Sequence, residues 1–214
     1  MPRFFTLTQN DEAVMVCSPH PLAILSSAVV GGGFLHARVI LNRHVSKNYD
    51  HPHPDQDLRA FAARLGVEEP FVGLMTAAYL DRTQVIELDD RGLRLALVMT
   101  AGFSNATAAG LSPPAGPEHR PLPGTINLIL LLDAALSPAA MVNAVITATE
   151  AKTAAIRAWA LRTPDGLPAT GTSTDAVVVA CTGRGEPLPY AGPATPVGHL
   201  IARAVRVGMK GARP

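Results

Sequence analysis

Two stretches of the chain combine a long apolar run with polar residues at its amino end. Residues 124–132 read GTINLILLL, and residues 169–181 read ATGTSTDAVVVAC. A continuous apolar run of this kind is typical of a strand that is buried on both faces. Polar groups beside such runs cost free energy unless they are hydrogen-bonded or used in chemistry. We therefore expect two core strands and a polar site at the edges of these apolar segments.

The segment between these stretches predicts a long alanine-rich helix. Ser137-Pro138 is a typical helix start, because serine caps the free amides and proline fits the first turn. We expect the helix to run to about Leu161, with Pro164-Asp165-Gly166 ending it. Its two faces are an apolar stripe and an alanine side, formed by Val142, Ile146, Thr149, Thr153, Ile156 and Ala160, and by Ala148, Ala151, Ala155 and Ala158. Such a helix leaves little surface for water, which predicts a central, tightly packed element.

The remaining pattern predicts a single α+β domain over residues 1–214. We expect a mixed sheet packed with the long central helix and shorter helices, and a frayed tail over residues 206–214. The expected strands are Ala13–Cys17, Leu22–Val30, Phe34–Leu41, Gln84–Leu88, Leu93–Thr100, Thr125–Leu132 and Val177–Cys181, with a break at residues 18–21. Two short helices are expected. The first starts near Asp55 or Asp57 and runs to about Leu65, and the second covers Gly198–Val207.

Composition limits the class of protein. Of the 214 residues 48% are hydrophobic and 16% charged, so a sizeable core can form. The formal charge of +1 argues against a nucleic-acid surface. The amino terminus has no signal-peptide pattern, and no apolar run reaches the ~18–20 residues that span a bilayer. We expect a soluble, cytoplasmic protein in which Cys17 and Cys181 are buried free thiols.

Three loops carry clusters of glycine, histidine or proline. The glycines at 31–33 favour a hairpin or bulge over a phosphate loop, because no phosphate-binding spacing follows. The segment with His44, His51 and His53 fits no common zinc spacing, so we favour a solvated loop and expect no metal site. The proline-rich stretch Gly102–Gly124 is predicted to be a functional lid or a disordered loop; His119 within it is interpreted as a surface residue.

Charged and hydroxyl side chains near the two polar clusters are the candidate catalytic groups. Glu150 and Lys152 lie roughly 160° apart on the helix, so they cannot pair with each other. Thr172 or Ser173 is a candidate nucleophile or oxyanion donor, with water as the alternative nucleophile. Asp175 is a candidate base or orienting group. The alternatives stay open: Glu150 pairs with another residue such as Arg157, Lys152 extends to solvent, and the loop hydroxyls satisfy their own backbone.

Six segments together resemble the adenosylcobinamide amidohydrolase family of corrinoid salvage enzymes. They occur in the family's order and cover most of the chain, and they are VGLMTAA at 72–78, TAGFSNA at 100–106, GTIN at 124–127, TATEAK at 147–152, ATGTSTDA at 169–176 and YAG at 190–192. The resemblance implies hydrolysis of the amide that joins the aminopropanol arm to the corrin ring of adenosylcobinamide. The products would be adenosylcobyric acid and 1-amino-2-propanol.

A corrin is broad, flat and fringed with amides, so its site needs neutral hydrogen-bonding groups. The candidate substrate-binding residues are Asn42, Thr76, Asn105, Thr125, Asn127, Thr149, Thr170 and Thr174. Amide hydrolysis also needs a base, a proton donor and oxyanion stabilisation. We assign the base to Glu150 or Asp175 and the donor or oxyanion partner to Lys152, with no cofactor beyond the corrinoid substrate. The alternatives are a corrinoid-binding protein without catalysis and an acyltransferase on another large ligand.

Overall fold

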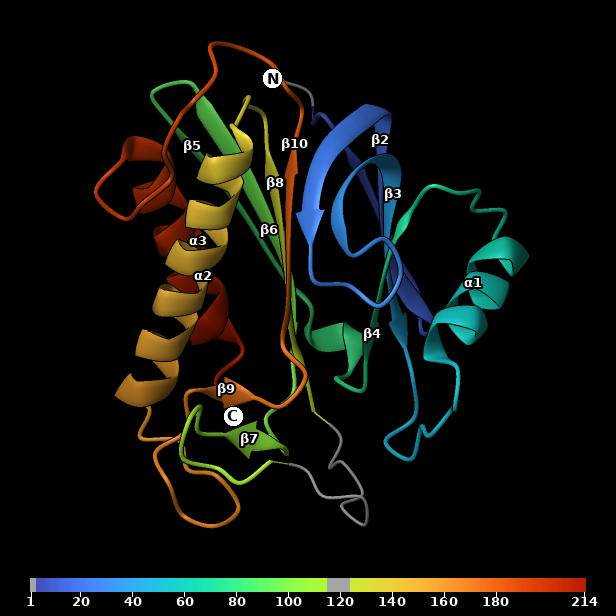
Figure 1. Ribbon diagram of the computed structural model, residues 1–214, viewed down its shortest axis with the longest axis vertical. Coiled ribbons are helices and arrows are strands. Elements are labelled where there is room, and N and C mark those ends of the chain that lie inside the picture. The colour runs from blue at the N-terminus through green and yellow to red at the C-terminus, as the bar shows by residue number, and fades with distance from the viewer. Residues whose placement is uncertain (1–2, 115–123) are drawn as a thin grey trace.

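The structure is a computed structural model that describes residues 3–114 and 124–214. It is organised around one mixed eight-stranded sheet (Figure 1). The strand order is β4-β3-β2-β10-β8-β6-β5, and β1 pairs with β2. The strands are β1 Thr6–Gln9, β2 Ala13–Ser26, β3 Gly33–His44, β4 Val72–Thr76, β5 Gln84–Asp90, β6 Leu93–Ala101, β8 Ile126–Leu132 and β10 Ala176–Cys181. The α+β prediction is confirmed.

The middle of the sheet is the pair of strands expected from the two apolar runs. All seven residues of β8 are buried, and β10 runs parallel to it, with Ala176 opposite Asn127. The helix α2 (Pro138–Ala158) connects the two strands, as a parallel pair requires. This register brings the polar residues before β8 and those before β10 to the same end of the sheet.

The sheet curls so that its concave face packs against itself. Alternate residues of β2, β3, β6, β8 and β10 share one aliphatic core with Leu74 of β4. The corner lies inside β2, where the pairing with β3 shifts register between Cys17 and Leu22. The expected break between two strands at residues 18–21 is therefore wrong. Pro19 and Pro21 lie at an irregularity within one continuous strand.

Helices cover the outer side of the sheet. The helices α2 and α3 (Pro196–Gly211) pack over β10, β8, β6 and β5, while α1 (Pro54–Arg64) packs against β3 and β4 (Figure 1). A short 3-10 helix, η1 (Leu80–Arg82), follows β4. Among the described residues no helix is long and apolar enough to cross a membrane.

The long helix lies with its alanine side inward, which corrects the expectation of a helix packed all round. Five alanines of α2 are buried against the sheet and α3, namely Ala140, Ala144, Ala148, Ala151 and Ala155. Val142 and Ile146, from the opposite stripe, are 50% and 49% exposed. Small side chains let backbones approach closely, which favours the alanine side. The helix ends at Ala158, before Ala160, which has a left-handed φ of 55°.

Three smaller expectations also change or gain detail. Residues 206–211 continue α3 with Met209 buried, so the frayed tail predicted from Arg206 is wrong. Asp57 does not cap α1, whose cap position is His53 without a side-chain bond. The glycine turn joins the antiparallel strands β2 and β3, as predicted. Its Gly31 has φ 70° and lies against the Phe71 carbonyl, where a Cβ would come within 2.5 Å. The part of the proline-rich stretch at residues 115–123, with His119, lies outside the described residues.

Candidate active site

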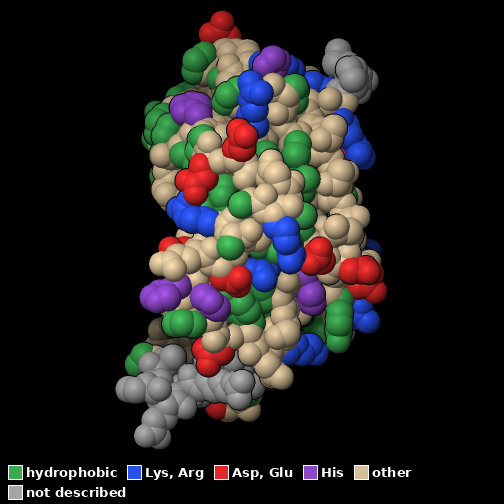
Figure 2. Space-filling view, turned by 90° about the vertical axis from the view of Figure 1, so that its right-hand side faces the viewer, with side chains coloured by type: hydrophobic (Ala, Val, Ile, Leu, Met, Phe, Trp, Pro, Cys, Tyr) green, Lys and Arg blue, Asp and Glu red, His purple; other side chains and the backbone are tan. Residues whose placement is uncertain are grey.

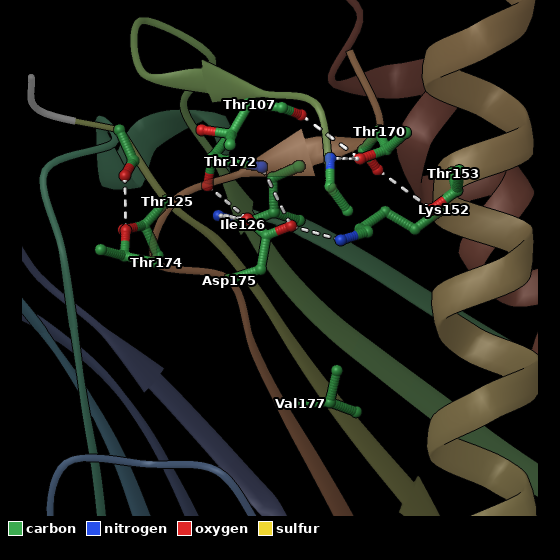
Figure 3. Close-up of polar contacts among 12 residues, drawn as sticks. Thr107, Thr125, Ile126, Lys152, Thr153, Thr170, Thr172, Thr174, Asp175 and Val177 are labelled. Atoms are coloured by element: carbon green, nitrogen blue, oxygen red, sulfur yellow. Dashed lines mark hydrogen bonds and ion pairs between the residues drawn. The ribbon is translucent and has the colours of Figure 1, made fainter. Parts of the chain in front are cut away.

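The polar residues before β8 and β10 meet at one end of the molecule. A small ribbon of β7 (Ala106–Thr107) and β9 (Gly171–Thr172) closes this end, beside the last turns of α2 (Figures 1 and 3). Segments that are distant in sequence therefore contribute to a single region, as the sequence pattern predicted.

The carboxylate of Asp175 is the centre of this region (Figure 3). Its Oδ2 accepts hydrogen bonds from the Lys152 ammonium and from the Thr172 amide, at 3.2 Å for the latter. Its Oδ1 accepts from the Thr172 hydroxyl and from the Ile126 amide, again at 3.2 Å for the latter. The side chains of Lys152 and Asp175 are only 9% and 15% exposed. A charged pair at this depth is justified only by close pairing or by chemistry.

A glycine makes this arrangement possible. Gly171 precedes Thr172, and a Cβ on it would lie 2.6 Å from Asp175 Oδ2 and 2.9 Å from Lys152 Nζ. Any side chain here would therefore push the ion pair apart. The helix contributes a second contact, because Thr153 Oγ1 donates to the Thr170 carbonyl at 3.0 Å. The loop before β10 is thus fixed to α2 on both sides of the glycine.

A group of hydroxyls and an amide lies next to the carboxylate. Thr125 and Thr174 share a hydrogen bond of 2.5 Å, and Thr174 Oγ1 also reaches the Gly124 carbonyl at 2.8 Å. Asn105 Nδ2 donates to the same carbonyl at 2.7 Å and to Ser173 Oγ at 2.8 Å. Asn105 Oδ1 is buried without a hydrogen-bond partner in the described part of the chain. These contacts join the loops that precede β7, β8 and β10.

A second polar network lies on the concave face of the sheet. Asn127 Nδ2 donates to Asn42 Oδ1 and to the Met75 carbonyl, both at 2.9 Å. Asn42 Nδ2 in turn donates to Thr100 Oγ1 at 3.0 Å. Both asparagines are almost fully buried, so these amides tie β3, β4, β6 and β8 together. Thr76, also predicted to bind substrate, accepts the Ala78 amide instead at 3.1 Å.

Two predicted residues lie away from this region. Glu150 and Thr149 occupy the exposed side of α2, whereas Lys152 points inward. The helical projection separated Glu150 from Lys152 correctly but could not say which flank met the sheet. Thr170 is near the site, but its hydroxyl accepts the Ala109 amide at 2.9 Å. Thr100, Thr153 and Gly171 were not predicted as site residues. Of these, only Gly171 had a signal in the sequence, its position directly before Thr172.

A cavity opens beside this group of hydroxyls, at Gly124. It has a volume of about 780 Å³ and is lined on one side by Ala101–Ser104 and Gly124, and on the other by Ala77–Tyr79 and the chain end from Gly211 to Pro214. Gly124 belongs to both the cavity wall and the network of Asn105 and Thr174. The volume falls within the range of ligand pockets.

The loop between β3 and α1, which carries His51 and His53, makes its own contacts. His51 stacks on Tyr49, and no group of three or more metal-ligating side chains occurs in the described residues. Tyr49 Oη donates to Asp57 at 2.8 Å, and Arg43 pairs with the same carboxylate at 2.7 Å. The bond from Tyr49, followed by Arg43, lowers the pKa of Asp57. Burial, and then this bond, raises the pKa of Tyr49 to about 12.

The surface on the α1 side carries both signs of charge. Figure 2 shows Lys and Arg side chains interspersed with Asp and Glu over this face, with histidines in both its upper and lower parts. The intermixing matches the near-neutral formal charge of +1. No uniform field therefore covers this face.

Comparison with known proteins gives a consistent result. Residues 3–213 match the family model described as adenosylcobinamide amidohydrolase. A protein of that name from Methanosarcina mazei is 36% identical over 193 residues, which are 86% of each chain. Another of that name, from Halobacterium salinarum, is 44% identical over 119 residues, which are 54% of this chain and 48% of the relative.

Proposed function

The chain belongs to the adenosylcobinamide amidohydrolase family, and from this we infer that it hydrolyses the amide between the aminopropanol arm and the corrin ring of adenosylcobinamide. The products are adenosylcobyric acid and 1-amino-2-propanol. The family match over residues 3–213 is the observation that carries this conclusion. The buried set of acid, base and hydroxyl groups around Asp175 is compatible with amide chemistry.

The corrin ring is assigned to the 780 Å³ cavity. The alanines and glycines of its mixed wall leave room for a flat ring, while Ser104 and the polar side chains of the wall suit the fringe of amides. Gly124 belongs to the wall and accepts hydrogen bonds from Asn105 and Thr174, so we propose that an arm extending from the ring passes Gly124 to reach the carboxylate. Asn42 and Asn127 support the strand ends rather than the substrate, since their amides bond to each other.

The reaction assigned to these groups starts at Thr172. Its Oγ1 attacks the amide carbonyl carbon while its proton passes to Asp175, to which it is already hydrogen-bonded. The carbonyl oxygen becomes an oxyanion, and the Lys152 ammonium provides the nearest positive charge. Collapse of the intermediate breaks the C–N bond, and Asp175 returns the proton to the leaving amine. Water then cleaves the ester by the same transfers and restores the threonine.

The other predicted residues take lesser roles in this scheme. Ser173 is exposed and bonded to Asn105, so it orients that amide rather than attacking. Glu150 is assigned no role. The side chains named here supply the base, acid and charge, so we propose that no resident cofactor or metal is needed. We also propose that the enzyme works in the cytoplasm.

Incubation with adenosylcobinamide tests the function. We expect release of 1-amino-2-propanol, measured by mass spectrometry, together with a corrinoid product that carries a free carboxylate. A corrinoid that binds with a shifted absorption spectrum but releases no amine would contradict catalysis. Transfer of the corrinoid acyl group to an added amine without net hydrolysis would instead indicate an acyltransferase.

A further inference from the structure

Tyr79, three residues after the end of β4, contributes an aromatic side chain to the wall of the 780 Å³ cavity. The residue is 57% exposed, although its chain neighbours Ala78 and Leu80 are buried. The main chain before it is held by two contacts, because the Ala78 amide donates to Thr76 Oγ1 and the Ala78 carbonyl accepts from His44 Nδ1, both at 3.1 Å. A fixed backbone therefore presents this ring to the cavity instead of to the core.

A second aromatic residue lines the same cavity. The ring of Phe103 packs edge-on against Trp159, with ring centroids 5.7 Å apart and ring planes at 87°. The segments that carry Phe103 and Tyr79 are neighbours, because a Cβ on Gly102 would lie 3.6 Å from the Cβ of Ala78. The cavity thus receives two aromatic side chains from two adjoining segments.

Polar side chains lie around the Tyr79 ring. Lys47 Nζ is 5.3 Å from the ring centre, over one face of the ring. Asp81, two residues further along the chain, also lines the cavity, and its side chain is exposed. An aromatic face with a nearby carboxylate suits a nucleoside, because the base stacks on the ring and the carboxylate accepts hydrogen bonds from the ribose hydroxyls.

The substrate of the proposed function carries one group of this kind. Adenine is the only aromatic group of adenosylcobinamide, because the corrin macrocycle is not aromatic and its fringe consists of methyl groups and amides. The adenosyl group projects from one face of the corrin at the cobalt, so its subsite must lie beside the plane of the macrocycle. Lys47, Tyr79 and Asp81 are all exposed, which leaves this wall open to a projecting group.

We infer that Tyr79 stacks on the adenine of the adenosyl group and that Asp81 accepts hydrogen bonds from its ribose. This inference rests on the proposed function, because it assumes that the cavity holds an adenosylated corrinoid. Tyr79 is then a specificity-determining residue. It favours corrinoids that carry the adenosyl group over corrinoids that carry a smaller axial group.

Two cobyric acids that differ only in the axial group test the inference. Adenosylcobyric acid and methylcobyric acid both lack the aminopropanol amide, so neither is consumed during a calorimetric titration. With Tyr79→Ala we expect the Kd of the adenosyl form to rise about 5- to 100-fold, the effect of losing one base–aromatic stack. The Kd of the methyl form should stay within about twofold of wild type, since it makes no such stack. Asp81→Asn should raise only the Kd of the adenosyl form, by about tenfold.

The stacking itself has a spectroscopic readout. In proton NMR, the adenine H2 and H8 signals of adenosylcobyric acid should move upfield on binding to the wild-type chain, because these protons lie over an aromatic face. Tyr79→Ala should remove most of this shift, whereas Tyr79→Phe keeps the ring and should keep both the shift and the Kd. Phe34→Ala is the matched control, because Phe34 is another exposed aromatic residue, at 52%, that does not line this cavity.

Release of aminopropanol from adenosylcobinamide is measured on the same preparations. A wild-type chain that releases the amine, while Tyr79→Ala weakens both cobyric acids equally or neither of them, would overturn the adenosyl subsite and leave the proposed function standing. Selective weakening of the adenosyl form without amine release by the wild-type chain would support the subsite and overturn hydrolysis. A wild-type chain that neither binds a corrinoid nor releases the amine would overturn both.

Discussion

At the scale of single residues, we expect the pairing of Asp175 with Lys152 to contribute to both stability and activity. Asp175→Asn removes the base, so we expect turnover to fall by about 10²–10⁴. It also leaves a buried ammonium with a weaker partner, and loss of one member of a buried pair costs on the order of 3–5 kcal/mol. Release of aminopropanol and urea unfolding measure the two effects.

Controls separate the two effects. The double variant Lys152→Met with Asp175→Leu should regain most of the stability, because no unpaired charge remains, but no activity. Glu150→Gln, on the exposed side of the same helix, should keep the wild-type rate. An Asp175→Asn chain that turns over at the wild-type rate would exclude Asp175 as the base.

Thr172 allows a direct choice between a hydroxyl and a water nucleophile. Thr172→Val keeps the shape but loses Oγ1, whereas Thr172→Ser keeps a hydroxyl for Asp175. We expect the valine variant to lose at least about 10³-fold in kcat and the serine variant about tenfold or less. Trapping of a corrinoid ester on the wild-type chain, seen by mass spectrometry, would support the same conclusion. Near-normal turnover by Thr172→Val would point to water.

At the scale of elements, the alanine side of α2 sets how closely the helix approaches the sheet. Ala148 is fully buried there, so Ala148→Leu should overpack the interface and destabilise the fold by about 1–3 kcal/mol. Ala158→Leu, an exposed position of the same helix, is the matched control and should be nearly neutral. Urea denaturation of both variants checks this. Equal effects of the two substitutions would contradict the packing described here.

The contact between Tyr49 and α1 should make stability depend on pH. The pKa of Asp57 in the folded chain lies below its ordinary value of 3.8, chiefly because Tyr49 donates to it. Its contribution is therefore present above pH 3.8 and is lost as the pH falls through the folded pKa. Tyr49→Phe should cost about 1 kcal/mol at neutral pH. The difference from wild type should shrink in unfolding measurements below pH 3.8, and a constant difference would argue against this origin.

The elements that could be predicted from sequence are those with a local signal. The continuous apolar runs identified β8 and β10, and Ser137-Pro138 identified the start of α2. The side of α2 that faces the sheet could not be predicted, because hydrophobicity favoured the Val142 stripe while close packing favours alanine. In the same way, the sequence placed Lys152 and Asp175 at candidate positions, but their pairing depends on a contact across 23 residues.

At the scale of the whole molecule, the curled sheet brings residues together that no local pattern connects. The bond between Asn42 and Asn127 spans 85 residues and links β3 to β8, which lie on either side of β2 and its irregularity at residues 18–21. The sequence pattern predicted most strands of the main sheet, but neither β1 nor β4 and not the strand order, so the concave network and the cavity could not be predicted from the sequence. Six short segments in family order indicated the function without this geometry.

The catalytic groups proposed for this chain should be sufficient without a resident metal. We expect dialysis against a strong chelator to leave the rate of amine release and the urea midpoint unchanged within error, because acid, base and charge all come from side chains. Adding back divalent zinc, magnesium or manganese should not raise the rate. A loss of activity that one of these ions restores would contradict the proposal.

The pairing of β2 with β10 has a consequence for biosynthesis. Residues 23–26 bond to residues 178–181, so the first half of the sheet gains its inner neighbour only after nearly all of the chain has been made. On the ribosome, the edge of β2 that later pairs with β10 therefore stays unpaired, and unpaired strand edges can bind strands of other chains. Nascent chains should therefore rely on chaperones until β10 emerges from the exit tunnel. Products of premature termination should be insoluble instead of merely inactive.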